Sequence, residues 1–199
     1  MKTSKRFVSP VIMLFLLLTL NSCTMLDQIN QVQQLALCEF NVLGVNEVSI
    51  AGIELRENME RDDLNAAQIM QLTAAVFRRE MIVDFNLLLD IDNPNNKTAA
   101  MNRMDYELFI DNKEILTGQM NQPVNVGPNA SAQLPMPIRL DLFKVLNNET
   151  QDALVNLAFK LTGDQSNPSE ILLKVKPYIK VGGRELAYPG FLNVRHTLK

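Results

Sequence analysis

The sequence predicts a mainly β protein, built as an antiparallel β-sandwich with two or three short helices. Three observations support this fold class. Residues 81–95 alternate apolar and polar side chains, further short alternating segments follow at hairpin spacing, and two regions change to a helical period. The length of 199 residues suits one domain, and a hydrophobic content of 47% is enough to form a core.

Residues 81–95 carry the clearest strand signal. One parity of this segment is apolar, with Met81, Val83, Phe85, Leu87, Leu89 and Ile91, and the other is mostly polar, with Asp84, Asn86, Asp90 and Asp92. This two-residue period is typical of a strand with one buried face. We expect the strand to end at Asn93-Pro94-Asn95, because proline lacks the amide that a ladder needs and asparagine suits turns.

Two elements are expected before this strand. Residues 38–55 alternate loosely, with Gly44 and Gly52 as interruptions, which predicts a strand followed by a second short strand or a bulged extension. A helical period then begins near Leu64, and Asp62 and Asp63 are expected to cap it, because aspartate accepts hydrogen bonds from free first-turn amides. The helix carries an apolar stripe interpreted as packed core (Leu64, Ala67, Ile69 or Met70, Leu72 and Val76) and a solvated end (Arg78 and Arg79).

The strands expected after residue 95 cover residues 101–110, 114–120, 122–128, 131–140, 171–181 and 186–194. Asp111-Asn112-Lys113 and Gly182-Gly183 predict tight turns, and Pro189-Gly190 interrupts the last strand. Pro135 and Pro137 predict that residues 131–140 form an edge strand or a strand with an irregular ladder, because proline donates no ladder hydrogen bond. Residues 141–163 predict one or two short helices, with Asn148 or Thr150 as a cap and Gly163 as a stop.

The N-terminus has the pattern of a secretory signal. Lys2, Lys5 and Arg6 precede a short apolar run at residues 11–20, which is too short to span a bilayer. Leu20-Asn21-Ser22-Cys23 then resembles the bacterial lipobox, which implies cleavage before Cys23 and lipidation of its thiol. The alternatives are an ordinary signal peptide or a core helix with a chance cysteine.

This interpretation divides the chain into a lipoprotein signal peptide (1–22), a lipid anchor and tether (23–37) and the β-sandwich domain (38–199). Two acyl chains are enough for stable anchoring, so the membrane is an expected partner. Thr24 is not the aspartate that resembles an inner-membrane retention signal, so we expect an outer-membrane location facing the periplasm. With Cys23 lipidated, Cys38 has no intrachain partner and is expected to be a small buried hydrophobe.

The charge balance narrows the possible partners. Removing the first 22 residues takes away three of the 19 basic side chains and none of the 22 acidic ones, so the net charge changes from −3 to −6. An acidic domain argues against nucleic-acid binding, which needs a basic face.

The middle of the chain resembles the group-two late-embryogenesis-abundant domain, also called the water-stress and hypersensitive-response domain. The resemblance lies in residues 87–95, 104–108 and 115–118, where a strand ending in Asn-Pro-Asn precedes a hairpin whose return strand carries Thr117-Gly118. It implies an immunoglobulin- or fibronectin-like sandwich and a stress-linked, non-catalytic binding or protective role. Some family members are proposed to carry lipid between their sheets.

Three features of the sequence could in principle carry chemistry or binding. Asp90, Asp92, Asn93 and Asn95 offer oxygen ligands for calcium, but no EF-hand glycine or distant glutamate accompanies them, so turn formation explains them better. His196 is the only histidine, and no Gly-x-Ser-x-Gly elbow accompanies it, so a surface or packing role is expected. Lys174, Lys176 and Lys180, with Arg139, are interpreted as a solvated face, with anionic lipid or peptidoglycan as the alternative. The sequence therefore predicts no catalytic residue, no cofactor and no metal site.

Two functions remain open. The first is a membrane-anchored interaction or stress-protective module that contacts an envelope protein through sheet edges and loops. The second is a carrier that holds a lipid or another apolar ligand in its Met- and Leu-rich interior. The carrier predicts a continuous apolar cavity between the sheets, and the interaction module predicts a tightly filled sandwich.

Overall fold

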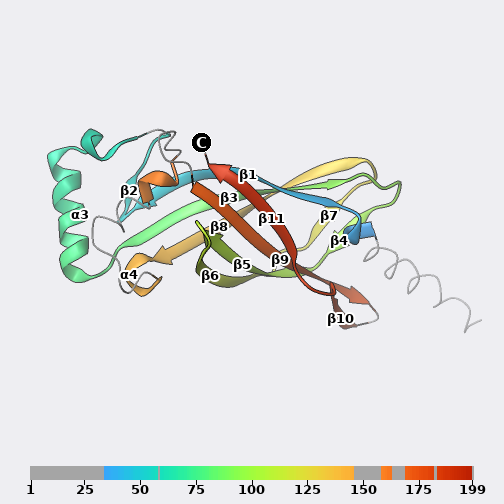
Figure 1. Ribbon diagram of the computed structural model, residues 1–199. Coiled ribbons are helices and arrows are strands. Elements are labelled where there is room, and N and C mark those ends of the chain that lie inside the picture. The colour runs from blue at the N-terminus through green and yellow to red at the C-terminus, as the bar shows by residue number, and fades with distance from the viewer. Residues whose placement is uncertain (1–33, 58, 146–157, 163–168, 182, 199) are drawn as a thin grey trace, which may run out of the picture.

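Two antiparallel sheets pack face to face (Figure 1). The computed structural model describes residues 34–57, 59–145, 158–162, 169–181 and 183–198. Within them the strands are β1 (Glu39–Ile50), β2 (Ile53–Glu54), β3 (Ile82–Asn93), β4 (Ala99–Met101), β5 (Arg103–Ile110), β6 (Lys113–Met120), β7 (Val124–Val126), β8 (Ala130–Asp141), β9 (Ser169–Val181), β10 (Arg184–Ala187) and β11 (Leu192–Leu198).

The first sheet has the strand order β2-β1-β3-β8. The second has the order β10-β9-β5-β6, with β11 also paired to β9, and β4 pairs with β7 in a separate ladder. The predicted fold class, an antiparallel β-sandwich, is confirmed.

Strand β3 is the centre of the first sheet. It pairs antiparallel with β1 on one side and with β8 on the other. Every odd-numbered residue from Met81 to Ile91 is buried, which confirms the predicted inward face. The buried face continues one step further than the apolar pattern, because Asn93 is also fully buried.

The inner faces of the two sheets share one buried cluster. It includes Leu87 and Met136 from the first sheet and Met104, Leu108 and Leu173 from the second, all less than 2% exposed. Burial of such apolar surface is the main driving force for folding, and it stabilises by about 25 cal/mol for each Å² removed from water.

The edges of the sandwich follow the turn and proline signals. Strand β1 has two register shifts, one of them at Gly44, and β2 follows as a short extension, as predicted. Asp111 and Asn112 both have positive φ, which is the geometry of the tight hairpin expected between β5 and β6. Strand β8 pairs with β3 only, so Pro135 and Pro137 belong to an edge strand as predicted.

The last predicted strand is interrupted at Pro189-Gly190, as expected, and its two parts are β10 and β11. Strand β9 pairs along one side with β5, and along its other side with β11 and then β10. Pro189-Gly190 lies between β10 and β11, and both strands run in the same direction, antiparallel to successive parts of β9.

Helices η1 (Arg61–Asp63), α3 (Ala66–Arg78) and α4 (Leu142–Val145) lie within the described residues, which also include short helical segments at 34–36 and 158–160. The cap predicted for α3 was wrong, because Asn65 caps it and not Asp62 or Asp63. The Asn65 side chain accepts a hydrogen bond from the Gln68 amide at 3.0 Å, and the Gln68 side chain accepts one from the Asn65 amide at 2.9 Å. Asn65 and Gln68 thus form a reciprocal capping box, and Asp62 and Asp63 lie in η1, before α3 begins.

Three groups of predicted features lie outside the described residues. They are the signal peptide with Cys23, the caps at Asn148 and Thr150, and the stop at Gly163. Where the description begins, residues 34–36 are helical, and Leu35 is buried in the core cluster. No helix in the described part of the chain has both the length and the apolar character needed to cross a bilayer.

Candidate interaction surface at helix α3

Helix α3 lies at one end of the sandwich, and the chain enters the fold at the other end (Figure 1). Strand β1 leads from the entry end toward α3, and β3 leads back. Each strand has 12 residues, so the sandwich separates the two ends by about 40 Å at roughly 3.3 Å per residue. The fold therefore holds α3 far from residue 34, where the described part of the chain begins.

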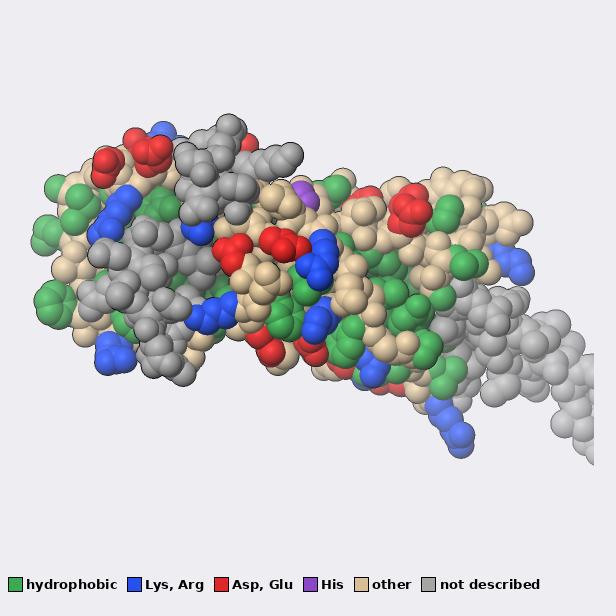
Figure 2. Space-filling view, in the orientation of Figure 1, with side chains coloured by type: hydrophobic (Ala, Val, Ile, Leu, Met, Phe, Trp, Pro, Cys, Tyr) green, Lys and Arg blue, Asp and Glu red, His purple; other side chains and the backbone are tan. Residues whose placement is uncertain are grey.

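The outward face of α3 is apolar. Leu72 and Ala75 are buried against the sandwich, whereas Ile69 is 51% exposed, Met70 74% and Phe77 85%. In Figure 2, hydrophobic side chains are visible at this end of the molecule. Three large apolar side chains this exposed on one helix form a surface of the kind that marks an interaction site.

This exposure corrects the prediction that the whole apolar stripe of α3 is core. Leu64 and Leu72 are buried and Val76 is half-buried, but Ala67 and both Ile69 and Met70 are exposed. The helix is apolar around most of its circumference, so its pattern could not tell which side faces the sandwich.

Charges occur at both ends of α3 but not along its outward face. Glu60, Asp62 and Asp63 precede the helix, and all three are exposed. At the other end, Arg78 Nε lies 3.8 Å from a Glu80 carboxylate oxygen, and the Arg79 guanidinium lies 5.5 Å from the Phe143 ring centre. The expected solvated arginines are confirmed as exposed, and Arg79 also contacts Phe143.

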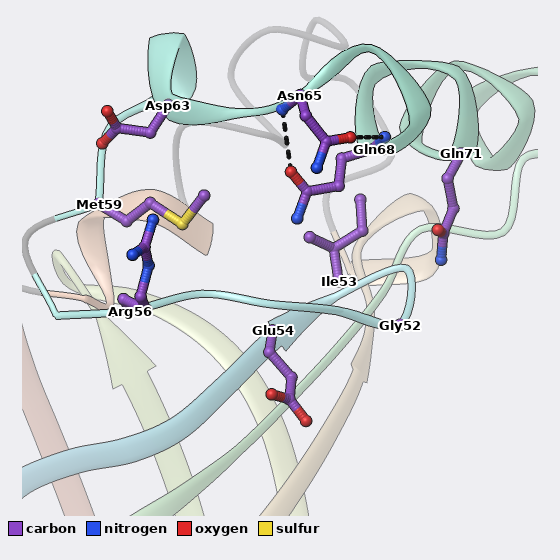
Figure 3. Close-up of a pocket in the computed structure, with 9 residues that line it drawn as sticks. All are labelled: Gly52, Ile53, Glu54, Arg56, Met59, Asp63, Asn65, Gln68 and Gln71. Carbon is purple, nitrogen blue, oxygen red and sulfur yellow. Dashed lines mark hydrogen bonds between the residues drawn. The ribbon is translucent and has the colours of Figure 1, made fainter.

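A pocket of about 540 Å³ lies between α3, η1 and the β1–β2 turn (Figure 3). Its lining is mostly polar and consists of Gly52, Ile53, Glu54, Arg56, Met59, Asp63, Asn65, Gln68 and Gln71. Several of these groups have structural roles: Gln71 donates a 2.8 Å hydrogen bond to the Ala51 carbonyl, and Asn65 and Gln68 form the helix cap. The polar groups of this pocket thus fasten α3 to the β1–β2 turn, and its described lining contains no nucleophile–base pair.

His196 lies in a second pocket, of about 320 Å³, between β1 and β11. The side chain is half-buried, and burial lowers the pKa of its imidazole despite an opposing hydrogen bond to the Val42 backbone. The lining described for this pocket contains no serine or cysteine, and the Thr162 hydroxyl is occupied by a 2.7 Å hydrogen bond to the Phe159 carbonyl. A packing role for His196 fits this arrangement.

The lysines of β9 do not form a uniformly basic face. Lys174 Nζ lies 3.1 Å from a Glu107 carboxylate oxygen and 4.3 Å from the Phe109 ring centre. Lys176 lies 5.8 Å from the ring centre of Phe191. Arg139 is in the other sheet, where it pairs with Asp84 at 3.3 Å. The structure therefore does not bring Arg139 to these lysines.

The oxygen-rich cluster at the end of β3 is organised by Asn93. Its side-chain amide donates hydrogen bonds to three carbonyl oxygens, of Lys97 at 2.9 Å, Val126 at 3.0 Å and Gly127 at 2.8 Å. Its side-chain oxygen accepts hydrogen bonds from the backbone and side chain of Asn95. The Asp92 carboxylate accepts a hydrogen bond from Ser131. The turn interpretation accounts for these contacts.

No group of acidic, histidine or cysteine side chains among the described residues is arranged to hold a metal ion. The expected lipidation site, Cys23, lies outside the described residues. Sequence reasoning missed the outward face of α3, although the lack of any acidic residue in this helix was a usable signal.

Comparison with known proteins gives both remote structural similarities and a family. A crystal structure of a protein from Archaeoglobus fulgidus is 14% identical, with a TM-score of 0.36, and covers 80% of this chain and 98% of its own. A solution structure of a protein from Arabidopsis thaliana is 15% identical, with a TM-score of 0.39, and the match covers 59% of this chain and 70% of that protein. The solution structure of a late embryogenesis abundant (LEA) protein is 10% identical, with a TM-score of 0.37, and the match covers 100% of this chain and 91% of that protein.

None of these similarities is close enough to carry a functional argument. No curated protein matches the chain. The family model matches residues 88–188, just over half of the 199 residues, from the second half of β3 through the β5–β6 hairpin to β10. The chain therefore belongs to the late embryogenesis abundant protein family LEA_2.

Proposed function

We propose that this protein is a lipid-anchored, non-catalytic interaction or stress-protective module of the cell envelope. Its family supports a stress-related or ligand-binding role. The observation that carries the proposal is the outward face of α3, where Ile69, Met70 and Phe77 are exposed at the end of the sandwich opposite the tether.

The anchor and the helix face have complementary roles in this proposal. Lipidation at Cys23 would hold the tether at the membrane, and two or more acyl chains make such anchoring stable. The sandwich then acts as a rigid spacer of about 40 Å, estimated from the 12 residues of β1. A partner would meet α3 on the side away from the membrane. With an outer-membrane anchor, that side is the periplasm.

A non-catalytic role is consistent with the chemistry of the described pockets. The polar side chains beside α3 cap the helix and fasten it to the β1–β2 turn. Burial lowers the pKa of His196, which favours its neutral form. A general base needs a substrate proton or a nucleophile within hydrogen-bond reach, and neither pocket offers His196 a serine or cysteine.

The alternative function, a carrier of lipid between the sheets, has less support. A carrier needs open apolar space in the interior. The described side chains of the two inner faces instead belong to one buried cluster, and the largest of them are less than 2% exposed. The two pockets described here open at the α3 end and beside β1 and β11.

Photo-crosslinking in cells tests the interaction role. A photoreactive phenylalanine analogue replaces Met70 in the full-length protein, and in a matched control it replaces Gln133, an exposed residue of β8. We expect a discrete crosslinked product from position 70 only, and we expect Phe77→Glu to remove it. A monomer without adducts at position 70 would contradict the interaction role.

The anchor has its own test. Cys23→Ala should abolish incorporation of a labelled fatty acid and move the protein from the membrane fraction to the soluble fraction. Cys38→Ala is the matched control and should retain both label and membrane association. Membrane association that survives Cys23→Ala, without label on the wild-type protein, would reject lipidation at Cys23.

A further inference from the structure

The outward face of α3 has the residue spacing of a helix–helix contact. Ala66, Met70, Thr73 and Phe77 are all exposed and are separated by four, three and four residues. This spacing keeps side chains on one seam of a helix, as in coiled coils. The Thr73 hydroxyl donates a 2.7 Å hydrogen bond to the Ile69 carbonyl, so it needs no partner outside the helix.

The seam alternates small and large side chains. Its order is alanine, methionine, threonine, phenylalanine. If two such helices pack antiparallel, Ala66 faces Phe77 of the other copy and Met70 faces Thr73, so each large side chain meets a small one. A parallel pair would place Phe77 against Phe77 and Ala66 against Ala66. Facing large and small residues interdigitate, which favours the antiparallel pair.

The charges favour the same arrangement. Glu60, Asp62 and Asp63, with Arg61 among them, lie at the start of α3 and give it a net negative charge. Arg78 and Arg79, followed by Glu80, lie at its end and give it a net positive charge. In an antiparallel pair, the acidic end of each helix meets the basic end of the other. A parallel pair would bring like charges together. Opposite charges across an interface fix the register and exclude the wrong orientation.

We propose that α3 docks antiparallel against α3 of a second copy of this chain and forms a two-fold symmetric dimer. A two-fold axis places the same patch on both subunits, so the patch must be complementary to itself. The size alternation and the charge asymmetry of α3 meet this condition. This inference rests on the proposed function and names the partner of the same surface.

The expected contact is small. A helix of 13 residues is about 20 Å long and 10 Å wide, so the contact would cover about 200 Å² on each copy and on the order of 400 Å² in total. Stable interfaces bury more than about 1,000 Å². The dimer should therefore be weak in dilute solution and form mainly on the membrane, where the tether raises the effective concentration.

Disulfide trapping tests both the partner and the orientation. Two full-length copies with different tags, each with Cys38→Ser, are expressed together, one with Ala66→Cys and the other with Phe77→Cys. Mild oxidation of the membranes should give a mixed dimer, in which position 66 of one copy is joined to position 77 of the other. This mixed dimer should be about tenfold more abundant than either same-site dimer, which joins 66 to 66 or 77 to 77. Same-site cysteines would be about 16 Å apart along the helix axis, and a disulfide needs Cα atoms within about 7 Å.

Charge reversal provides a second measurement on the same membranes. Arg78→Glu or Asp62→Arg, introduced into both copies, should each reduce the mixed dimer several-fold, and both changes together in each copy should restore it. Gln133→Glu, on an exposed position of β8, is the matched control and should have no effect.

The outcomes separate this inference from the proposed function. Same-site dimers that equal the mixed dimer would reject the antiparallel geometry, and the absence of any disulfide dimer would reject self-association. If position 70 crosslinks only to another protein and the cysteine pairs stay reduced, the interaction role stands and the second copy is excluded as its partner. If neither experiment gives a product, both proposals fail.

Discussion

The ring of Tyr106 lies directly over Gly118. The two residues are paired across β5 and β6, and a Cβ atom added to Gly118 would lie 2.4 Å from both the Cζ and the Oη atom of Tyr106. Burial in this position raises the pKa of the Tyr106 hydroxyl. The glycine of the return strand is therefore required by the tyrosine opposite it.

Replacing Gly118 with alanine should destabilise the fold. The added methyl group would force the Tyr106 ring or the backbone to move, and overpacking of this kind costs about 1–3 kcal/mol. Gly127→Ala is the matched control, because its Cβ would lie 3.9 Å from the Ala130 Cβ, which is ordinary contact. Urea unfolding of protein lacking residues 1–23 measures both. If Gly118→Ala is as stable as Gly127→Ala, the packing argument is wrong.

Asn93 should be the most sensitive polar position of β3. In the wild type, the carbonyls of Lys97, Val126 and Gly127 accept hydrogen bonds from the Asn93 side-chain amide. Asn93→Asp keeps the shape of the side chain but places a carboxylate oxygen against these three carbonyl oxygens. Leaving buried polar groups unpaired costs about 1–3 kcal/mol each, more for a charge, so a loss of about 3 kcal/mol or more is expected. Asn96→Asp, at an exposed position three residues on, should be nearly neutral in the same unfolding measurement. Equal stability of the two variants would contradict the structural role of Asn93.

Much of the sandwich was predictable because its signals are local. The alternation in β3, the Asp111-Asn112 turn and the prolines of β8 each determine backbone geometry within a few residues. The sequence pattern did not reveal that Asn93 is buried, because its partners Val126 and Gly127 are more than 30 residues away. A short local window contains no information about such a contact.

The candidate site was less predictable for a related reason. A helix that is apolar on most sides fits either a deep core or an interface, and only its neighbours decide. Here the sandwich covers Leu72 and Ala75 and leaves Phe77 outside. The pairing of Lys174 with Glu107 likewise depends on β5 and β9 being neighbours, which the separate strand patterns did not specify.

Asp105 should make the fold sensitive to acid. Desolvation alone would raise the pKa of its carboxyl, but hydrogen bonds from Tyr178 at 2.7 Å and Gln119 at 3.1 Å, together with the nearby Arg103 guanidinium, lower the pKa below its usual value. A carboxyl with a lowered folded pKa stabilises the fold above its unfolded pKa, and this contribution is lost as pH falls through the folded pKa.

The free energy of unfolding should therefore be higher for the wild type than for Asp105→Asn at pH 7, and the gap should shrink between about pH 5 and pH 2. The control is Asp84→Asn, which removes only an exposed ion pair with Arg139 and should cost at most about 1 kcal/mol. Urea titrations across this pH range measure the gap. A gap for Asp105→Asn that stays constant with pH would show that its charge does not contribute.

Cys38 should be nearly inert in the folded protein. Burial, with a smaller contribution from the charge of Asp92, raises the pKa of its thiol to about 11, and the thiol lies 3.4 Å from the Gln34 carbonyl. Only the thiolate reacts, so at pH 8 alkylation should be more than about a hundredfold slower than for a free cysteine. The rate should rise about tenfold per pH unit up to pH 11, and it should approach the free-cysteine value in 8 M urea because unfolding removes the burial.

Cys38 is the one thiol left once residues 1–23 are removed, so mass spectrometry after timed alkylation reports on it directly. The structure places Cys38 one residue before β1, half-buried against the core cluster rather than in a fully buried strand as predicted. Rapid alkylation of the native protein at pH 8 would mean that this thiol is exposed and reactive, and it would contradict a packing role.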